Sequence, residues 1–378
     1  MCIRDSPRLI ELVHYAHSKD VEITIDAEEQ DRLTLSLNII EKLALDKVIK
    51  NWTGFGIALQ AYGKRSINVI HWINKILDKR EKMHLRLVKG AYWDYEIKHA
   101  QVFGYEDYPV YSKKSLTDIS FLLCAKEILK NEKIYAKFAT HNAHTISSVH
   151  QLGQGKDYEF QRLYGMGELL YQSAEKVLNL EKKPSVYAPI GSYKDLLPYL
   201  VRRLLENGAN SSFINRLLDP ETDANWLAEN PAIRIEKEKI DIPLPKNIFT
   251  ERKNSSGFDL SENSNLENLV KSISAHKKNK INAESIYVNR DEKEKVGQKV
   301  YSIANNEEIG TAIFDDPTNV KSALENFASE KWSKYSVQER SQILIKISDD
   351  IEKDPSELIF YLLNDCLLYT SDAADDSR

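Results

Sequence analysis

The fold of this chain is decided by the stretch Arg86-Leu87-Val88-Lys89-Gly90-Ala91-Tyr92-Trp93-Asp94. It begins as an apolar strand and ends in a glycine, two large aromatic residues and an acid. Glycine lets the backbone approach a flat ligand, because no Cβ stands in the way. Aromatic rings offer faces for stacking, and cations donate to anionic groups. A strand built only for the core would not need Arg86, Lys89 and Trp93 together. We therefore predict that this strand ends at a functional site.

Strand-like and helix-like segments alternate on both sides of this stretch, up to about residue 220. The expected strands cover residues 21–26, 56–62, 85–90, 135–142, 160–165 and 186–191. The expected helices cover residues 30–47, 67–80, 118–131, 143–152 and 193–207. This alternation is typical of parallel βαβ units. About six units in one row favour a (β/α)8 TIM-like barrel, and no GxGxxG motif follows any strand to indicate a dinucleotide-binding sheet.

Candidate site residues follow the expected strands at their carboxyl ends. They are Asp26, Gln60, Arg86, Lys89, Thr140, His141, Asn142, Met166, Glu168 and Tyr187. The carboxyl ends of barrel strands open onto one face, which holds the active site of barrel enzymes. Scattered surface residues would not fall so regularly at one end of the strands. We therefore interpret this region as a catalytic barrel.

Composition sets broad limits on the function. With 378 residues the chain can form about two domains. Its net charge of −5 gives no overall basic field that would attract nucleic acid. The sequence has neither an apolar run of about 18 residues nor a signal-peptide core, so we expect a cytoplasmic protein. Cys2, Cys124 and Cys366 have no paired spacing, which argues against a disulfide framework or a zinc ribbon.

The pattern changes after residue 220. Residues 221–283 contain several prolines and a lysine-rich run, and they are typical of a linker with short helices. A new unit follows. Residues 300–303 and 309–313 suggest a hairpin, and residues 317–335 and 337–353 suggest amphipathic helices. Residues 1–6 and 367–378 look foreign to their surroundings, so we expect an internal piece of a longer reading frame with a non-native tail.

An arginine pair lies on the helix expected at residues 193–207. Arg202 and Arg203 are about 100° apart around that helix, but their long side chains could converge on one carboxylate, which arginine binds in a bidentate manner. Glu206 lies one turn further on and could hold a guanidinium in place. Tyr187 and Tyr199 would wall the apolar body of a small acid. The alternative is a solvated basic face with a salt bridge, and tyrosines that only pack in the core.

Metal binding is a second candidate chemistry. A metal-dependent TIM-barrel hydrolase or lyase would use His141 and Asp26 among several converging ligands. The other strand ends carry mainly amides and cations, which are poor ligands. We therefore favour His141 as a hydrogen-bond donor to a bound cofactor and expect no metal, with the hydrolase or lyase kept as the alternative. A non-catalytic scaffold is a third possibility, against which the retained arginine pair argues.

The chain also resembles a known family, the proline dehydrogenase barrel of bifunctional proline utilization A enzymes. The resemblance runs from about Val21 to Leu218. Its motifs are Ile25-Asp26-Ala27-Glu28-Glu29, Gln60-Ala61-Tyr62, RLVKGAYWD at 86–94, FATHNAHT at 138–145, GMGE at 165–168, YAPIG at 187–191 and YLVRRLLENGAN at 199–210. Seven long motifs in the same order leave little room for a chance match.

The resemblance implies an FAD enzyme that oxidises L-proline to 1-pyrroline-5-carboxylate, in the catabolism of proline to glutamate. A hydride would pass from proline C5 to flavin N5, and the electrons would then go to quinone. The resemblance also implies that the parent protein can associate peripherally with the inner face of the cytoplasmic membrane and can form a homo-oligomer. This fragment would bind no nucleic acid, because the DNA-binding unit of some members is absent.

The resemblance assigns roles to matching positions of this sequence. Asp26, Tyr187, Arg202 and Arg203 would be catalytic. The proline site would consist of Tyr92, Leu163, Tyr187, Tyr199, Arg202, Arg203 and Glu206. FAD would be held by Gln60, Arg86, Val88, Lys89, Gly90, Trp93, Lys113, Lys114, Thr117, Thr140, His141 and Asn142, with Arg86 near the flavin N5 edge.

The resemblance also divides the chain into parts. Residues 1–220 would be a proline dehydrogenase barrel that lacks its first strand and has an open edge beside residues 21–25. Residues 221–283 would be the linker, and residues 284–366 the truncated start of an aldehyde dehydrogenase domain. The parent's second activity would use NAD, which this fragment cannot bind. We expect the fragment to bind FAD weakly or to aggregate, and to be inactive in that case.

Overall fold

The computed structural model describes residues 2–208, 225, 228–237, 242–278, 280–284, 297–303, 305–325 and 329–365. The side chains of residues 205–208 are outside this description. The chain forms two compact units, residues 1–261 and 262–378. The division falls inside the segment that the sequence predicts to be a linker.

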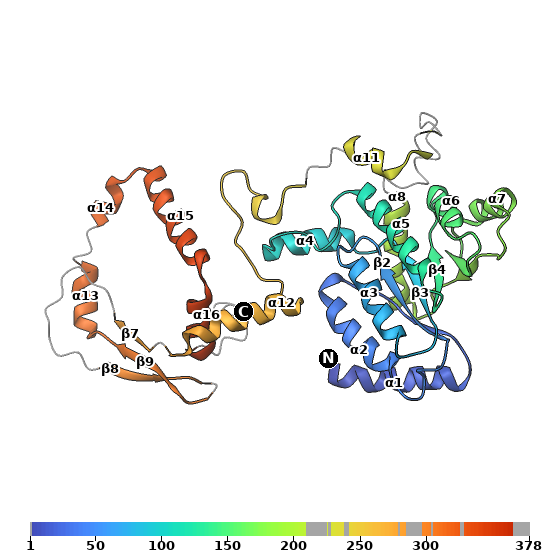
Figure 1. Ribbon diagram of the computed structural model, residues 1–378. Coiled ribbons are helices and arrows are strands. Elements are labelled where there is room, and N and C mark those ends of the chain that lie inside the picture. Colours follow the sequence, from blue (N-terminus) through green and yellow to red (C-terminus); the bar gives the residue numbers. More distant parts are fainter. Residues whose placement is uncertain are drawn as a thin grey trace. The chain divides into compact units, whose positions relative to one another are not determined.

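The first unit alternates strands and helices along the chain (Figure 1). Its strands are β1 (Ile23–Ile25), β2 (Phe55–Gln60), β3 (Met83–Val88), β4 (Ile134–Ala139), β5 (Tyr158–Leu163) and β6 (Ser185–Tyr187). Its helices are α1 (Cys2–Ser18), η1 (Gln30–Arg32), α2 (Leu33–Ala44), α3 (Ser66–Leu77), α4 (Trp93–Phe103), α5 (Lys114–Lys130), α6 (Ala143–Leu152), α7 (Glu168–Leu178), α8 (Tyr193–Gly208), α11 (Pro231–Lys237) and η2 (Pro245–Asn247).

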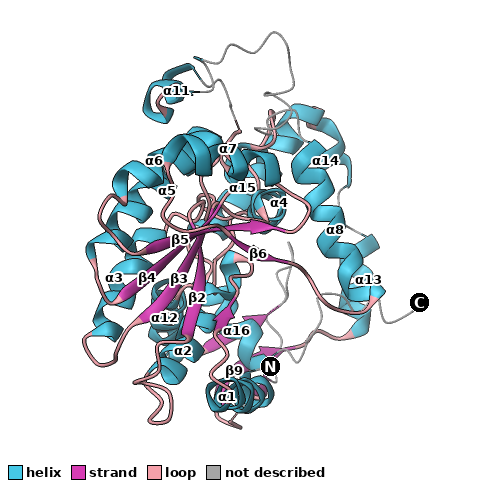
Figure 2. Cartoon of the chain, turned by 90° about the vertical axis from the view of Figure 1, so that its right-hand side faces the viewer, coloured by secondary structure: helices cyan, strands magenta, loops and turns pink. Residues whose placement is uncertain are grey.

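The six strands form one parallel sheet in the order in which they occur along the chain. This confirms the predicted α/β class with βαβ units. β1 and β6 are the two edge strands within the described part of the chain. The edge position of β1 agrees with the open edge predicted beside residues 21–25. Figure 2 shows the strands spread as a fan with helices around them.

Strands β1 to β5 present an apolar face to the helices. In β3, Met83, Leu85 and Leu87 are almost fully buried and belong to the main core cluster. The intervening residues His84 and Arg86 point to the other face of the sheet, since side chains alternate along a strand. The core therefore lies between the sheet and its surrounding helices, while polar side chains line the opposite, concave face.

Contacts across several strands reveal how strongly the sheet curls. Glu22 precedes β1 and Lys137 lies on β4, yet the Glu22 Oε2 atom and the Lys137 Nζ atom are 2.6 Å apart. In a flat sheet, strands three places apart would be separated by about 14 Å. Thr24 Oγ1 on β1 and His84 Nε2 on β3 are likewise only 2.8 Å apart. The sheet therefore bends as it does in a TIM-like barrel, and its concave face brings distant strands together.

Helices α4 and α7 of the first unit are not among the helices predicted from the sequence. Helix α4 buries Glu96 with Ile97 and Ala100, and a carboxylate in the buried stripe hides the apolar periodicity. Helix α7 buries Tyr171 and Ala174 and packs Leu170 and Leu178 partly against the core, so it has an apolar stripe that the prediction missed. Helices α2, α3, α5, α6 and α8 lie close to the five predicted ranges, with boundaries shifted by a few residues.

The second unit contains α12 (Asn263–Ala275), η3 (His276–Lys278), β7 (Ile281–Glu284), β8 (Gly297–Tyr301), β9 (Glu308–Ile313), α13 (Pro317–Glu325), α14 (Ser329–Lys334), α15 (Val337–Lys353) and α16 (Ser356–Asp365). The predicted hairpin is confirmed, because β8 and β9 pair in antiparallel fashion. β7 adds to it as a parallel partner of β9. A capping box of Ser336 and Glu339 starts α15 at the predicted residue. The single helix predicted at 317–335 is described as two, α13 and α14.

Candidate active site

Three strands bring Asp26, Arg86 and Tyr187 together on the concave face. Asp26 follows β1, Arg86 lies on β3 and Tyr187 ends β6. The Arg86 guanidinium donates a hydrogen bond to the Asp26 carboxylate, and its Cζ atom lies 5.8 Å from the centroid of the Tyr187 ring. Burial lowers the pKa of Arg86 from its usual value, and the nearby Tyr187 and Tyr199 partly offset this effect. The centre of the cluster is thus a guanidinium held between a carboxylate and an aromatic face.

Helix α8 adds the two predicted arginines to this end of the sheet. The Cζ atom of Arg202 lies 5.3 Å from the centroid of the Tyr92 ring, and that of Arg203 lies 5.5 Å from the Tyr199 ring. Both arginines are half-buried. The contact between Arg202 and Tyr92 joins α8 to the loop after β3, so this arginine faces the site and not bulk solvent.

His141 lies beside the arginine helix as a neutral ring. Burial and the charges of Arg203 and Arg162 lower the pKa of His141 to about 4. The backbone N–H of Leu163 donates to its Nε2 atom over 3.1 Å. Because Nε2 accepts this bond, we assign the ring proton to Nδ1. His141 therefore fits the predicted role of a hydrogen-bond donor, through Nδ1.

The loop after β3 is fixed by its own contacts. Lys89 pairs with Asp118 of helix α5, and the indole N–H of Trp93 donates to the carbonyl oxygen of Tyr111 over 2.9 Å. Gly90 has φ +149°, and a Cβ at this position would come within 2.4 Å of the Tyr62 ring. Glycine is thus required here both by the backbone conformation and by the close packing of a ring.

Gln60 is almost completely buried at the end of β2 and links two loops. Its Nε2 atom donates to the carbonyl oxygen of Glu28 over 2.7 Å, and its Oε1 atom accepts from the backbone N–H of Ala91 over 3.0 Å. The loop after β1 and the loop after β3 are therefore held by the same amide. Both polar ends of this predicted cofactor residue are engaged within the chain.

Thr140 and Asn142 shape the turn into helix α6. Asn142 caps the helix by accepting from the backbone N–H of Thr145 over 3.0 Å, and its own N–H donates to Thr140 Oγ1 over 3.2 Å. The buried Tyr171 hydroxyl donates to the carbonyl oxygen of Thr140 over 2.8 Å. These bonds fix the turn that carries His141.

Lys113, Lys114 and Thr117 lie at the start of helix α5. Lys113 is the N-cap residue and makes no capping side-chain hydrogen bond, and Thr117 is buried in the first turn. A helix N-terminus with two lysines suits an anionic group, since backbone N–H groups and positive charge coincide there. Of the remaining predicted residues, Val88 is half-buried, Leu163 is buried, and the side chain of Glu206 lies outside the described residues.

Two residues of this region went unrecognised in the sequence. Glu28 accepts a hydrogen bond from the Tyr92 hydroxyl over 2.9 Å. Glu96 is buried and accepts from the Gln30 N–H over 2.7 Å and from the Tyr62 hydroxyl over 3.3 Å. Each carboxylate joins elements that are far apart in the sequence. The available signal is that Glu28 stands inside one recognised motif and Glu96 lies two positions after another, and neither position reveals a contact.

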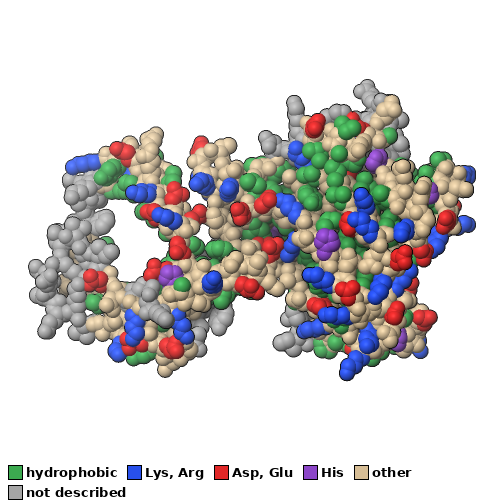
Figure 3. Space-filling view, viewed as in Figure 1, with side chains coloured by type: hydrophobic (Ala, Val, Ile, Leu, Met, Phe, Trp, Pro, Cys, Tyr) green, Lys and Arg blue, Asp and Glu red, His purple; other side chains and the backbone are tan. Residues whose placement is uncertain are grey.

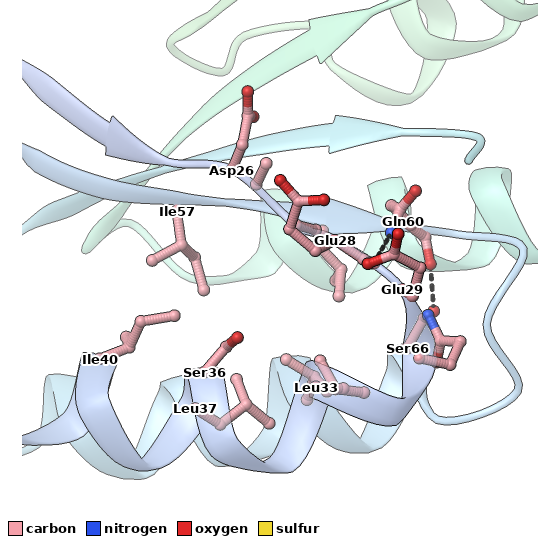
Figure 4. Close-up of a pocket in the computed structure, with 15 residues that line it drawn as sticks. Asp26, Glu28, Glu29, Leu33, Ser36, Leu37, Ile40, Ile57, Gln60 and Ser66 are labelled. Carbon is pink, nitrogen blue, oxygen red and sulfur yellow. Dashed lines mark hydrogen bonds between the residues drawn. The ribbon is translucent and has the colours of Figure 1, made fainter. Parts of the chain in front are cut away.

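A small pocket lies on the other side of the sheet, between β2 and helix α2 (Figure 4). Leu33, Leu37 and Ile40 rise from the helix to form its apolar floor, and Glu28 and Gln60 also line it. Figure 4 shows the Asp26 carboxylate pointing away from α2. Asp26 is therefore common to both places: it lines the pocket, and its carboxylate accepts a hydrogen bond from Arg86.

The described residues contain no group of three or more His, Cys, Asp or Glu side chains that could hold a metal ion. Across the same residues, no helix is long and apolar enough to cross a membrane. Figure 3 shows positive and negative side chains interspersed over the visible face, in keeping with the modest net charge.

A curled parallel sheet with cations and aromatic rings at the carboxyl ends of its strands defines an α/β-barrel enzyme. The family model of proline dehydrogenase matches residues 3–216, which is more than half of the chain. The chain therefore belongs to the proline dehydrogenase family, the oxidoreductases of proline catabolism. The comparisons give no support to the metal-dependent hydrolase or lyase.

The chain is similar to several proteins named bifunctional protein PutA. It is 37% identical to that of Salmonella typhimurium over 98% of this chain and 30% of the relative, and 45% identical to that of Klebsiella aerogenes over 71% and 22%. Among solved structures, proline utilization A from Bdellovibrio bacteriovorus inactivated by N-propargylglycine has a TM-score of 0.78 at 25% identity, over 95% of this chain and 38% of that one. A variant of proline utilization A from Bradyrhizobium japonicum has a TM-score of 0.69 at 40% identity, over 76% of this chain and 30% of that one. The chain thus spans under a third of the length of these curated relatives.

Proposed function

We propose that this chain carries the site at which a proline dehydrogenase oxidises L-proline to 1-pyrroline-5-carboxylate with FAD as its cofactor. The observation that supports this most directly is the meeting of Arg202 with the Tyr92 ring at the strand ends, beside the pair of Arg86 and Asp26. A small imino acid has one carboxylate and an apolar ring, and this cluster offers a partner for each.

The donor set fits FAD. A flavin ring needs hydrogen-bond donors along its polar edge, which Arg86 and the Nδ1–H of His141 would supply. Its pyrophosphate needs cations or a helix N-terminus, and the start of α5 with Lys113 and Lys114 provides both. We assign Gln60, Val88, Lys89, Gly90, Trp93, Thr117, Thr140 and Asn142 to the same cofactor site. When bound, FAD would accept the two electrons that proline loses.

The chain's own residues would bind and orient the substrate. Arg202 and Arg203 would bind the proline carboxylate, while Tyr92, Leu163, Tyr187 and Tyr199 would wall its ring, with Glu206 holding the arginines from the next turn of α8. Asp26 would fix the orientation of Arg86 through their ion pair. A positive charge at this place would favour a cofactor that gains negative charge on reduction.

The second unit has a separate proposed role. We assign residues 284–366 to the start of an NAD-dependent aldehyde dehydrogenase domain, residues 221–283 to the linker and residues 367–378 to a non-native tail. In support, the match to the Salmonella relative extends over 98% of this chain, and that relative is named bifunctional. The parent protein would then oxidise glutamate semialdehyde with NAD in its second domain.

The electron acceptor is a proposed property of the whole parent protein. We propose that it passes them to quinone, in the cytoplasm and at the inner face of the cytoplasmic membrane, and that it assembles as a homo-oligomer. The membrane contact would be peripheral, through a surface and not through a spanning helix.

Turnover of L-proline tests the proposed function. The chain is incubated with excess FAD and a redox dye as electron acceptor, and dye reduction is followed with L-proline or D-proline. We expect reduction with L-proline alone, since the arginine pair and the ring walls define one hand of the substrate. Absence of turnover with saturating FAD, in protein shown to be folded, would refute the proposal.

A further inference from the structure

Two loops at the carboxyl ends of β1 and β3 are locked together by Gln60, which contacts the backbone of Glu28 on one side and of Ala91 on the other. This arrangement sets the side chain of Glu28 next to that of Tyr92. The Tyr92 hydroxyl donates to Glu28 Oε2 over 2.9 Å. The family motifs and the substrate site described above give Glu28 no role.

The Tyr92 hydroxyl keeps its proton across the physiological pH range. Burial, together with the hydrogen bond to Glu28 and its negative charge, raises the pKa of Tyr92 to about 12. The phenol therefore keeps its proton and acts as a donor. A phenol that donates to a carboxylate is polarised, and its ring becomes a better partner for a cation.

The opposite partner of the Tyr92 ring is Arg202, at 5.3 Å from Cζ to the ring centroid. The Nε atom of Arg202 is buried and has no hydrogen-bond acceptor within the described residues. The ring of Tyr92 is thus the contact that orients this guanidinium, and the hydrogen bond to Glu28 fixes the tilt of that ring.

We propose that Glu28 is a positioning residue for substrate binding: it holds the Tyr92 phenol, and the Tyr92 ring holds Arg202 where it receives the carboxylate of the substrate. This inference rests on the proposed function, because it assumes that Arg202 binds a carboxylate. It deepens that function by assigning a determinant of substrate affinity to the loop after β1, outside the arginine helix.

The test is a double-mutant cycle of Glu28→Ala and Tyr92→Phe, read as KM for L-proline, kcat and FAD affinity. Glu28→Ala should raise KM roughly fivefold to tenfold, with kcat and FAD affinity unchanged. In the Tyr92→Phe background the same change should have no further effect, because the bond is already absent. Glu28→Gln keeps an acceptor and should restore part of the affinity. Asp94→Asn, which removes an exposed carboxylate close by in the sequence, is the control and should leave KM unchanged.

The outcomes separate two failures. If the original chain neither binds nor oxidises proline, the proposed function and this inference both fail. If it does oxidise proline but the effects of Glu28→Ala and Tyr92→Phe add, or FAD affinity falls as much as proline affinity, the proposed function stands and the positioning role of Glu28 is overturned.

Discussion

Lys137 on strand β4 lies 2.6 Å from Glu22, which precedes strand β1, although two strands separate them in the sheet. Lys137 is almost fully buried and also approaches Glu159 of the neighbouring strand at 3.9 Å. This cation therefore ties three strands across the concave face. The curl of the sheet, and with it the convergence of the strand ends, depends on buried charge as well as on apolar packing.

Replacing Lys137 should reveal this dependence. We expect Lys137→Ala to lower the free energy of unfolding by about 2 kcal/mol, since it removes a buried cation from the partly buried Glu159 and from the exposed Glu22. The measurement is urea unfolding followed by circular dichroism. Lys182→Ala breaks the exposed pair with Asp157 and should cost less than about 1 kcal/mol. Equal losses in the two variants would contradict the special role of Lys137.

The buried Glu96 should make stability depend on pH. Burial is the main cause that raises its pKa to about 7, above the ordinary value of 4.5. Between these values the folded state keeps a proton that the unfolded state has lost, so stability falls as pH rises. Glu96→Gln removes this loss. Between about pH 5 and pH 8, its free energy of unfolding should therefore rise by about 2 kcal/mol relative to that of the original chain.

The measurement for Glu96 is the free energy of unfolding as a function of pH. Asp94→Asn is the matched control, because it removes an exposed carboxylate from the same helix. Its profile should run parallel to that of the original chain. A Glu96→Gln profile that also runs parallel would show that Glu96 does not titrate in this range.

Gly167 lies against His141 and offers a test of the ring's position. A Cβ at Gly167 would come within 2.8 Å of His141 Cδ2, whereas a Cβ at Gly165 would meet nothing within 4 Å. Both glycines have positive φ, +65° and +77°. Alanine at either position should therefore cost about 1 to 2 kcal/mol of stability through backbone strain.

The two alanine variants should differ in cofactor affinity. Only Gly167→Ala displaces His141, so we expect it alone to weaken FAD binding, by roughly fivefold to tenfold, as the loss of about one hydrogen bond would do. Flavin fluorescence measures the affinity. If both variants bind FAD with the same affinity, the assignment of His141 to the cofactor site is wrong.

Arg203 should affect substrate and cofactor differently. We expect Arg203→Met to raise KM for L-proline by roughly 30-fold or more, which corresponds to about 2 kcal/mol, because a charged hydrogen-bond donor to the carboxylate is lost. FAD should stay bound. Lys194→Met removes an exposed cation from the same helix and should change neither quantity. Unchanged kinetics in Arg203→Met would remove its role in binding the carboxylate.

The sequence predicts most of the alternation of strands and helices, because β1 to β5 have an apolar outward face and the helices predicted between them bury apolar side chains. It also predicts which residues end the strands, since parallel strands place these residues at one edge. The contacts between them need the curl of the sheet, which depends on pairs such as Lys137 and Glu22. Glu96 misled the prediction of α4 because a polar residue occupies a buried position.

The contact of Arg202 with the Tyr92 ring illustrates the same limit. Each residue stands in a recognisable motif, but 109 positions separate them, and no local pattern relates helix α8 to the loop after β3. The hydrogen bond between Tyr92 and Glu28 is still harder to predict from the sequence, because it depends on how Gln60 joins two loops.

The most direct measurement of the central claim is the visible absorption spectrum of the chain with FAD, recorded without oxygen before and after addition of L-proline. We predict that the absorption band of oxidised flavin disappears on addition of L-proline and persists with D-proline. In Arg203→Met the band should disappear only at much higher proline concentration. A band that persists in the original chain at saturating L-proline, with FAD shown to be bound, would contradict the account.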